Sequence, residues 1–421
     1  MTATDGRNVV DTLRVRDAKD VEEVVRAAIA SDQPLEIIGH GTKRAIGHPM
    51  ATNAVLDVSA LNAVTAYEPN ELIITVQAGA PLADVQSLID SKNQQFAFEP
   101  MDTSALLGVS GNGTIGGMIG AGLAGPRRIK AGGARDHLLG AHAVSGFGDS
   151  FKTGGRVVKN VTGYDLCKLL AGSWGTLAVM TEVTLKVMPK PESERTLVLT
   201  GLDDVSANRA MTAALGSPYD VSGAAHLPNS VFRPAPGELA GFSTQGRAAT
   251  LLRLEGIAAS VADRANSLVK ALAPFGPVDM LQDGASAAAW GAIRDVEPFA
   301  ASGALGAWPV WRIVCPPASG GALGQALARD SGGDVIYDWG GGLIWAALPP
   351  KPDGQAALVR QRVEAAGGHA ALIRASEQTR RKVDVFHPQA AGLAALSQRV
   401  RNSFDPKIIL NRGRMLLVSA P

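Results

Sequence analysis

The first ninety residues alternate between stretches with helical spacing and short apolar runs. Apolar residues at positions 21, 24, 25, 28 and 29 share one face of a helix, so we expect a helix over 18–30 with Asp17 at its N-cap. Runs rich in isoleucine and valine predict strands over 35–38, 54–58 and 72–77. A second helix is predicted over 82–90, with Pro81 in its first turn. The alternation favours a fold of mixed α and β elements.

The pattern changes after a strand predicted over 175–185. Residues 188–192 hold two prolines and charged side chains, which are typical of a linker. Beyond them, alanine-rich helices are predicted over 260–272 and 355–366, and strands over 250–254, 310–314 and 343–347. Five of the six tryptophans lie at or after Trp290, so the two halves should have different cores. A domain boundary is therefore expected near residue 190.

Composition narrows the class of protein further. A formal net charge of +1 over 421 residues argues against a dominant nucleic-acid surface. The two cysteines, Cys167 and Cys315, are far apart, which disfavours a disulfide framework and a cysteine-based metal site. We see neither a signal-peptide pattern nor an apolar run long enough to span a membrane. These features predict a cytoplasmic protein that meets a membrane only through partners.

Glycine is the compositional outlier, and its placement is uneven. Residues 108–175 hold 18 of the chain's 48 glycines, between apolar stretches that look well ordered. Another glycine loop, residues 39–43, follows a predicted strand. Glycines allow successive backbone N–H groups to approach an anion, and Thr42 and Lys43 add a hydroxyl and a charge. By itself this loop fits an anion cradle and an ordinary glycine turn equally well.

Residues 111–116 match the G-x-G-x-x-G pattern of an NAD-binding Rossmann fold, with Asp136 placed like a ribose-binding acid. The context argues against that interpretation. The preceding stretch, 104–110, is short and contains a glycine where a buried strand is required. Glycines and a proline also interrupt the helix that should follow, and each of these residues is unfavourable in a helix interior.

The glycine-rich tract taken as a whole is more informative. Its motifs, in order along the chain, are Thr114-Ile115-Gly116-Gly117, Gly125-Pro126, Arg135-Asp136, Thr153-Gly154-Gly155, the stretch 158–166 ending in Gly163-Tyr164-Asp165-Leu166, and Gly172-Ser173-Trp174-Gly175-Thr176-Leu177. This order resembles the FAD domain of the vanillyl-alcohol-oxidase/PCMH flavoprotein superfamily, and most closely its 2-hydroxy-acid branch. The resemblance covers residues 21–191 and returns at 404–415.

The resemblance implies an α+β fold. A PCMH-type FAD-binding domain over 1–190, with subdomains of about 1–100 and 101–190, would precede a cap domain with α/β character over 191–400 for substrate or partner. Residues 401–421 would return to the FAD domain. Four groups would bind non-covalent FAD: the pyrophosphate loop Gly39, His40, Gly41, Thr42 and Lys43; the second backbone stretch Thr114, Ile115, Gly116 and Gly117; the adenosine end Gly175, Thr176 and Val179; and Asn411 in the closing motif.

A covalent link to FAD is not expected. Family members that attach the flavin covalently use a histidine in the pyrophosphate loop, at the position of Thr42. His40 lies in the loop but two positions earlier.

The sequence lacks the histidine-rich metal-binding motif that this branch usually carries in its catalytic half. The C-terminal histidines (His226, His369 and His387) are isolated, so no metal site is expected. The basic residues near the loops (Arg127, Arg128, Lys130, Arg135 and Lys159) are more often surface charges or phosphate partners than substrate ligands. Tyr164 and Asp165 fit a structural turn as well as a role near the flavin, and we find no catalytic base.

In this absence, in its length and in its ending Asn411-Arg412-Gly413-Arg414-Met415, the chain resembles the family of E subunits of bacterial glycolate oxidase. The resemblance implies a second FAD-containing catalytic subunit, an iron–sulfur subunit and oxidation of glycolate to glyoxylate, in a cytosolic complex or at the inner membrane. Alternatives are a non-catalytic FAD relay or structural subunit, a stand-alone D-2-hydroxy-acid dehydrogenase, and a scaffold that no longer binds FAD.

Overall fold

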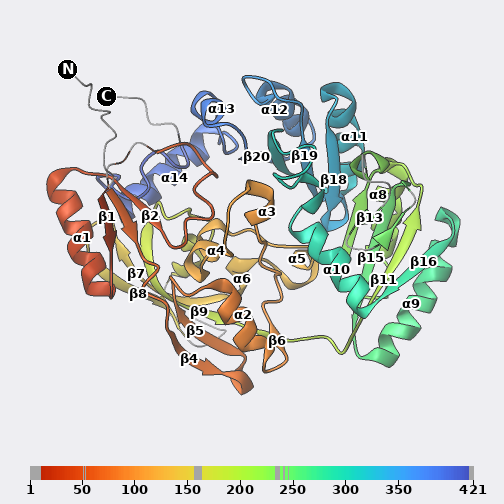
Figure 1. The fold of residues 1–421 in the computed structure, drawn as a ribbon, viewed down its shortest axis with the longest axis horizontal. Helices are drawn as coiled ribbons and strands as arrows, with labels where there is room; N and C mark the ends of the chain where they lie inside the picture. The colour runs from red at the N-terminus through yellow and green to blue at the C-terminus, as the bar shows by residue number, and fades with distance from the viewer. Residues whose placement is uncertain are drawn as a thin grey trace.

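The computed structural model describes residues 11–50, 52, 54–155, 164–232, 238–239, 242–244 and 246–416. Figure 1 shows two lobes side by side, with helix α14 (Ala391–Phe404) returning to the side of the first lobe. We call residues 11–190 the first lobe and residues 191–390 the second lobe. Both lobes mix helices and sheets, and the predicted α+β class is confirmed.

A three-stranded parallel sheet lies at the start of the first lobe. Its strand order is β1 (Asp11–Arg14), β3 (Ala54–Asp57) and β2 (Leu35–Ile38). Helix α1 (Ala18–Ser31) buries Val21, Val25 and Ala28. The Asp17 side chain accepts a hydrogen bond from the Asp20 N–H at 2.9 Å, so the predicted N-cap is confirmed.

A five-stranded antiparallel sheet forms the rest of the first lobe, and small helices cover it. Its strands, in spatial order, are β4 (Val64–Glu68), β5 (Ile73–Gln77), β9 (Ala178–Lys186), β7 (Leu138–Ser145) and β8 (Ser150–Gly154). The helices of this region are α2 (Leu82–Asp90), α3 (Ser104–Leu107), α4 (Ile115–Ala121), α5 (Arg128–Ala131), α6 (Ala134–His137) and α7 (Cys167–Leu170).

The second lobe is built on an eight-stranded antiparallel sheet. In spatial order its strands are β16 (Val278–Gln282), β11 (Ser193–Thr200), β15 (Ala249–Gly256), β12 (Gly223–Leu227), β18 (Asp334–Asp338), β19 (Leu343–Ala347), β17 (Val310–Val314) and β20 (His369–Arg374). Apart from short 3₁₀ turns, the other elements of this lobe are α8 (Asp204–Leu215), α9 (Ala258–Leu272), α10 (Asp283–Arg294), α11 (Gly320–Ser331), α12 (Ala356–Ala365), α13 (Glu377–Lys382) and the hairpin β13 (Glu238–Leu239)–β14 (Phe242–Ser243).

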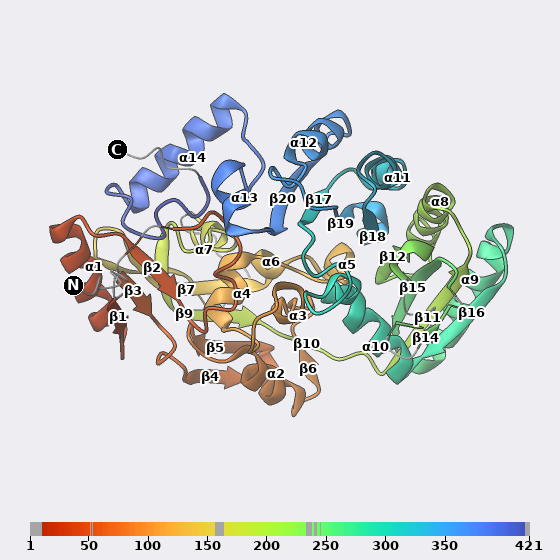
Figure 2. The same cartoon turned by 45° about the horizontal axis from the view of Figure 1, so that its top comes forward.

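The two faces of this sheet pack against different partners. One apolar cluster joins the sheet to residues of α8, α9, α11 and α12. The other contains Trp290, Trp339 and Trp345 together with Ile46, Met101, Leu106 and Leu123 of the first lobe. The second face of the sheet therefore looks toward the first lobe, an arrangement that can be followed in Figure 2.

Some predicted boundaries are wrong because of local backbone geometry. The strand expected over 175–185 begins only at Ala178, since Trp174 (φ 54°) and Gly175 (φ 69°) adopt left-handed conformations that a strand cannot use. Leu72 ends a short 3₁₀ turn (Pro69–Glu71) with φ 58°, so β5 begins one residue later than expected. Within the expected linker, Met188–Pro189 (β10) pairs with β6 (Gln94–Gln95).

A cluster of buried charges crosses between the lobes. The Arg253 guanidinium donates two hydrogen bonds to the carboxylate of Glu99, at 2.8 and 2.9 Å. Arg127 contacts Glu99 at 3.1 Å and Glu255 at 2.5 Å, and it lies 3.5 Å from Glu194. We call these five residues the interlobe ion cluster. Its members come from both lobes, so it links them directly.

No helix in the described part of the chain is long and apolar enough to cross a membrane.

Candidate functional site

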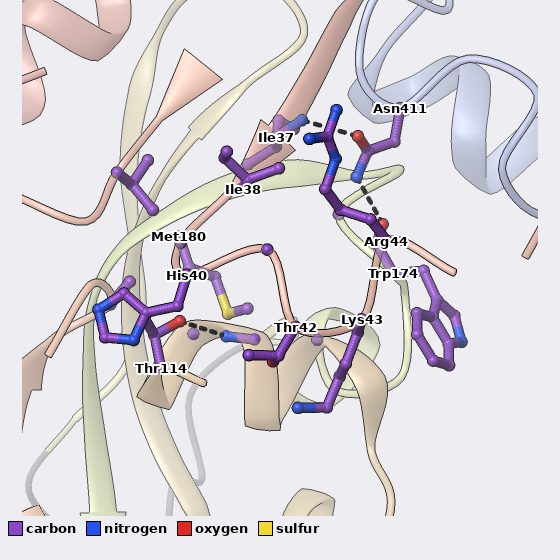
Figure 3. A pocket seen from close by; sticks show the side chains of 18 of the residues that line it. Ile37, Ile38, His40, Thr42, Lys43, Arg44, Thr114, Trp174, Met180 and Asn411 are labelled. Carbon is purple, nitrogen blue, oxygen red and sulfur yellow. Dashed lines mark hydrogen bonds between the residues drawn. The ribbon is translucent and has the colours of Figure 1, made fainter. Parts of the chain in front are cut away.

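A cleft opens in the first lobe, where its two sheets meet and the C-terminal segment returns. Most residues expected to bind FAD line it: Gly39, His40, Gly41, Thr42, Lys43, Thr114, Gly116, Gly117, Gly175 and Asn411. Segments far apart in the sequence therefore meet at one cleft (Figure 3).

The loop over 39–43 forms the floor of this cleft, directly after strand β2. Gly41 has φ +68°, a left-handed conformation that other residues rarely adopt. A Cβ on Gly39 would lie 2.5 Å from the Thr114 hydroxyl oxygen, so only glycine lets the loop pack against the second glycine segment. Gly41 is therefore favoured by its backbone conformation, and Gly39 is required because a side chain there has no space.

The loop exposes donors that have no protein partner. Among the described residues, no backbone or side-chain group accepts a hydrogen bond from the backbone N–H groups of residues 39–43. The Lys43 side chain makes no ion pair or hydrogen bond within the same part of the chain. Burial lowers the pKa of the Lys43 ammonium, whereas the charge of Asp102 acts to raise it. Free N–H groups and an unpaired cation fit a bound anion.

The segment 114–117 forms the facing wall. The Thr114 side chain N-caps α4 by accepting the Gly117 N–H at 3.2 Å. The Gly116 N–H bonds the Ala78 carbonyl at 2.7 Å, and a Cβ on Gly116 would lie 2.8 Å from the Ala78 Cβ. Gly116 thus brings the wall close to β5. Ile115 points into the core and is completely buried.

The C-terminal segment closes the third side. Asn411 accepts a hydrogen bond from the Ile37 N–H at 2.8 Å and donates one to the Trp174 carbonyl at 2.7 Å, as Figure 3 shows. Gly175 has no room for a side chain, because its Cβ would lie 2.6 Å from the Asn411 amide nitrogen. Arg414 donates to the Lys43 carbonyl at 2.5 Å, which ties this segment to the loop.

Three of the predicted FAD contacts do not line the cleft with their side chains. Ile115 and Val179 are packed in apolar clusters, and the Thr176 hydroxyl donates to the Ser173 carbonyl at 2.7 Å. Their role as cofactor contacts stays a prediction. His40 lines the cleft but is exposed, so its side chain is not held by the core.

Several lining residues were missed by the sequence reasoning. They are Ile37, Ile38, Arg44, Val58, Ala78, Gly120, Trp174, Met180 and Arg414. Most come from strand ends or follow a glycine motif, so proximity to a motif was a usable signal for Arg44 and Trp174. Nothing in the local pattern singles out Met180 or Val58, because their position depends on how the two sheets meet.

The Rossmann interpretation was rejected from the sequence, and the structure agrees. The segment before residue 111 is a helix, α3, and the helix after it, α4, ends at Ala121. Asp136 accepts the Gly133 N–H at 2.7 Å and so caps α6. Of the motif over 158–166, residues 158–163 lie outside the described residues. Tyr164 is exposed, and Asp165 accepts a hydrogen bond from the Cys167 thiol at 2.8 Å.

The histidines of the second lobe do not form a ligand set. His226 is buried on β12, with Nδ1 2.9 Å from the Thr250 hydroxyl. His369 and His387 have ring centroids 6.4 Å apart, and His387 Nδ1 lies 2.8 Å from an Arg360 nitrogen. Within the ranges that the structure describes, no group of three or more His, Cys, Asp or Glu residues could hold a metal ion.

The comparisons with known proteins agree with this geometry. Residues 12–154 match the model of an FAD binding domain family. Over 398 residues the chain is 30% identical to glycolate oxidase subunit GlcE of Escherichia coli K12, covering 93% of this chain and 95% of that protein. It is 35% identical over 184 residues to glycolate oxidase subunit GlcD of Bacillus subtilis, covering 43% of this chain and 38% of that protein.

A solved structure extends the likeness to the whole fold. The 4-ethylphenol oxidase from Gulosibacter chungangensis, solved as its isoeugenol complex, superimposes with a TM-score of 0.68 at 14% identity. The match covers 96% of this chain and 89% of that one. At this identity the likeness concerns the fold of both lobes and their arrangement.

Proposed function

Because this chain belongs to the family of glycolate oxidase subunit GlcE, within the PCMH-type FAD-binding oxidoreductases, we propose that it is the FAD-binding subunit of a complex that oxidises glycolate. The family resemblance seen in the sequence is thereby confirmed, and so is FAD as the cofactor. The observation that carries the proposal is the cleft, in which the glycine loops present free backbone donors next to Lys43.

The residues of the cleft suit the parts of FAD. The backbone N–H groups of residues 39–43 and the Lys43 ammonium would hold the pyrophosphate, because free N–H groups and a cation complement two phosphate charges. The wall made by Trp174, Gly175 and Asn411 would hold the adenosine end. Bound FAD would supply a two-electron acceptor for a hydride from the substrate. We propose that the FAD-binding domain covers residues 1–190, the cap domain 191–400, and that 401–421 completes the FAD-binding domain.

The reaction proposed for the complex is oxidation of glycolate to glyoxylate, with electrons passed to an iron–sulfur subunit. The similarity to both GlcE and GlcD supports a second, GlcD-like FAD subunit as partner. Such a complex would be cytoplasmic or peripheral at the inner membrane through its partners. A second candidate role is an electron relay, which the lack of a histidine-rich motif in the sequence favours.

Anaerobic spectroscopy tests this proposal. The purified chain is expected to show a flavin spectrum. We expect glycolate to bleach that flavin when the GlcD-like and iron–sulfur subunits are present. Bleaching of the lone chain would assign it its own catalysis, and bleaching only in the complex would assign it the relay role. A chain that takes up no FAD, or a complex inert to glycolate, would contradict the proposal.

The flavin should be held without a covalent bond. Thr42 occupies the position that would need a histidine, and its hydroxyl is buried beside Gly113. Acid precipitation of the yellow protein should therefore leave the flavin absorbance in the supernatant. Flavin that stays with the pellet after washing would overturn this prediction. Substituting Ala for the exposed His40 should leave the result unchanged.

A further inference from the structure

Two arginines from different lobes share one tryptophan at the contact between the lobes. The Arg128 guanidinium carbon lies 4.4 Å from the ring centroid of Trp339, and that of Arg312 lies 5.1 Å away. Trp339 follows β18 in the second lobe, and its indole N–H donates to the Gly125 carbonyl of the first lobe at 3.0 Å. The same carbonyl accepts the Arg128 N–H at 3.1 Å. Trp339 therefore fixes both arginines to the interlobe contact.

Arg312 has an unusual environment for a partly buried cation. It lies on β17 between Trp311 and Ile313, which pack into the helix-covered face of the sheet. Strand alternation turns Arg312 to the opposite face, toward the first lobe. In the described part of the chain, neither Arg312 nor Arg128 makes an ion pair or a hydrogen bond through its guanidinium. Arg253 and Arg374 show the usual environment of a buried arginine, because each guanidinium donates to several hydrogen-bond acceptors.

The one acidic group that acts on Arg312 is a weak counterion. Burial raises the pKa of Asp338 to about 7, so its carboxyl carries only part of a negative charge near neutral pH. Burial lowers the pKa of Arg312 to about 10, and repulsion by Arg128 acts in the same direction. Arg312 is therefore still charged at neutral pH. The two cations thus outweigh the nearby anion, and the partial burial of Arg312 without a partner costs free energy that a bound anion would offset.

The arginine pair and the FAD cleft both adjoin one large apolar cluster. Trp174, a wall of that cleft, packs against the same apolar cluster that contains Trp339. The Trp174 N–H also bonds the carbonyl of Gly120, another cleft residue, at 2.9 Å. A ligand held by the arginines would therefore lie at the contact between the lobes, against the cluster that Trp174 of the cleft wall also contacts.

We propose that Arg312 and Arg128 form a binding site for the carboxylate of a small 2-hydroxy acid, with Trp339 as the platform that holds them. This inference rests on the proposed function, because it names residues that would receive the substrate of that site. Arg312, the less exposed of the two, would supply the directional contact, since a guanidinium can pair with both carboxylate oxygens. Arg128, which is more exposed, would add charge and close the site from the first lobe.

Oxalate binding to the FAD-loaded chain tests the site without any turnover. Oxalate has two carboxylates on two carbons and no hydroxyl-bearing carbon to oxidise. Titration calorimetry should show binding to the wild type that is about 10- to 100-fold weaker in Arg312→Gln, since hydrogen bonds to charged groups are lost. Arg128→Gln should lower oxalate affinity less, and the affinity of Arg312→Lys should lie between those of the wild type and Arg312→Gln. Arg209→Gln, on the exposed side of α8, is the matched control and should bind like the wild type.

The outcomes separate this inference from the proposed function. Equal oxalate affinity in wild type and Arg312→Gln, or no oxalate binding by a wild-type chain that holds FAD, would overturn the carboxylate site. Glycolate-dependent bleaching in the complex tests the proposed function separately, and its result does not depend on oxalate binding. If Arg312→Gln loses FAD or unfolds, Arg128→Gln decides, because that residue is exposed and an unchanged affinity there would also count against the site.

Discussion

Replacing Gly41 with valine should give a folded protein that has lost most of its FAD. Gly41 has φ +68°, where a β-branched side chain is strained, and its Cβ would lie 3.2 Å from the Arg44 side chain. The loop can relieve this strain only by moving, and movement withdraws the free N–H groups from the pyrophosphate. The loss of several charge-assisted hydrogen bonds at once should lower FAD affinity by at least 100-fold.

The ratio of flavin to protein absorbance after purification measures this effect, and titration with added FAD gives the affinity. Gly201→Val is the matched control. Gly201 has φ +83°, and a Cβ there would meet nothing within 4 Å, so that variant has the same type of backbone strain away from the cleft. Gly41→Val with normal flavin content would show that the pyrophosphate lies elsewhere. A loss in both variants would indicate general destabilisation instead.

Replacing Arg253 with methionine should lower the free energy of unfolding by about 3–5 kcal/mol, because removing one partner leaves buried charges uncompensated. The interlobe ion cluster holds three carboxylates against two guanidiniums, and Arg253 is 1% exposed. Without it, Arg127 alone faces Glu99, Glu194 and Glu255. The stacking of Arg253 over Trp290, at 4.5 Å, is also lost.

The deficit should depend on pH. Burial acts to raise the pKa of Glu255, but the charges of Arg253 and Arg127 outweigh it and hold the pKa at about 2. A carboxyl whose pKa is lowered in the folded state stabilises the fold at pH values above its ordinary pKa of about 4.3. This stabilisation disappears as the pH falls toward 2. The wild type should thus lose its advantage over Arg253→Met in acid, while the gap stays full at neutral pH.

Urea unfolding followed by tryptophan fluorescence measures both effects. The control is Arg381→Met, which removes an exposed pair with Glu377 and should change stability by less than about 1 kcal/mol. Stability of Arg253→Met within 1 kcal/mol of wild type at neutral pH would show that the cluster contributes little. A gap that widens in acid would refute the assigned charges.

The sequence alone determined much of the local structure. The Asp17 cap and the spacing of apolar residues specify α1, because capping and helix periodicity are local effects. The glycine motifs located most of the cleft, since the left-handed turn at Gly41 and the close contacts of Gly39, Gly116 and Gly175 restrict those positions to glycine. The family could be inferred for the same reason: the loops have a fixed order along the chain.

Only the tertiary structure decided how distant segments meet. Asn411 reaches Ile37 and Trp174 because the chain end returns to β2, which no local pattern encodes. Arg127 looked like one of several loop cations, but it belongs to the interlobe ion cluster with residues more than a hundred positions away. Arg128, its neighbour, instead stacks on Trp339 and has no ion-pair partner among the residues that the structure describes. Charge and burial depend on the three-dimensional environment, so adjacent arginines with the same local sequence acquire different roles.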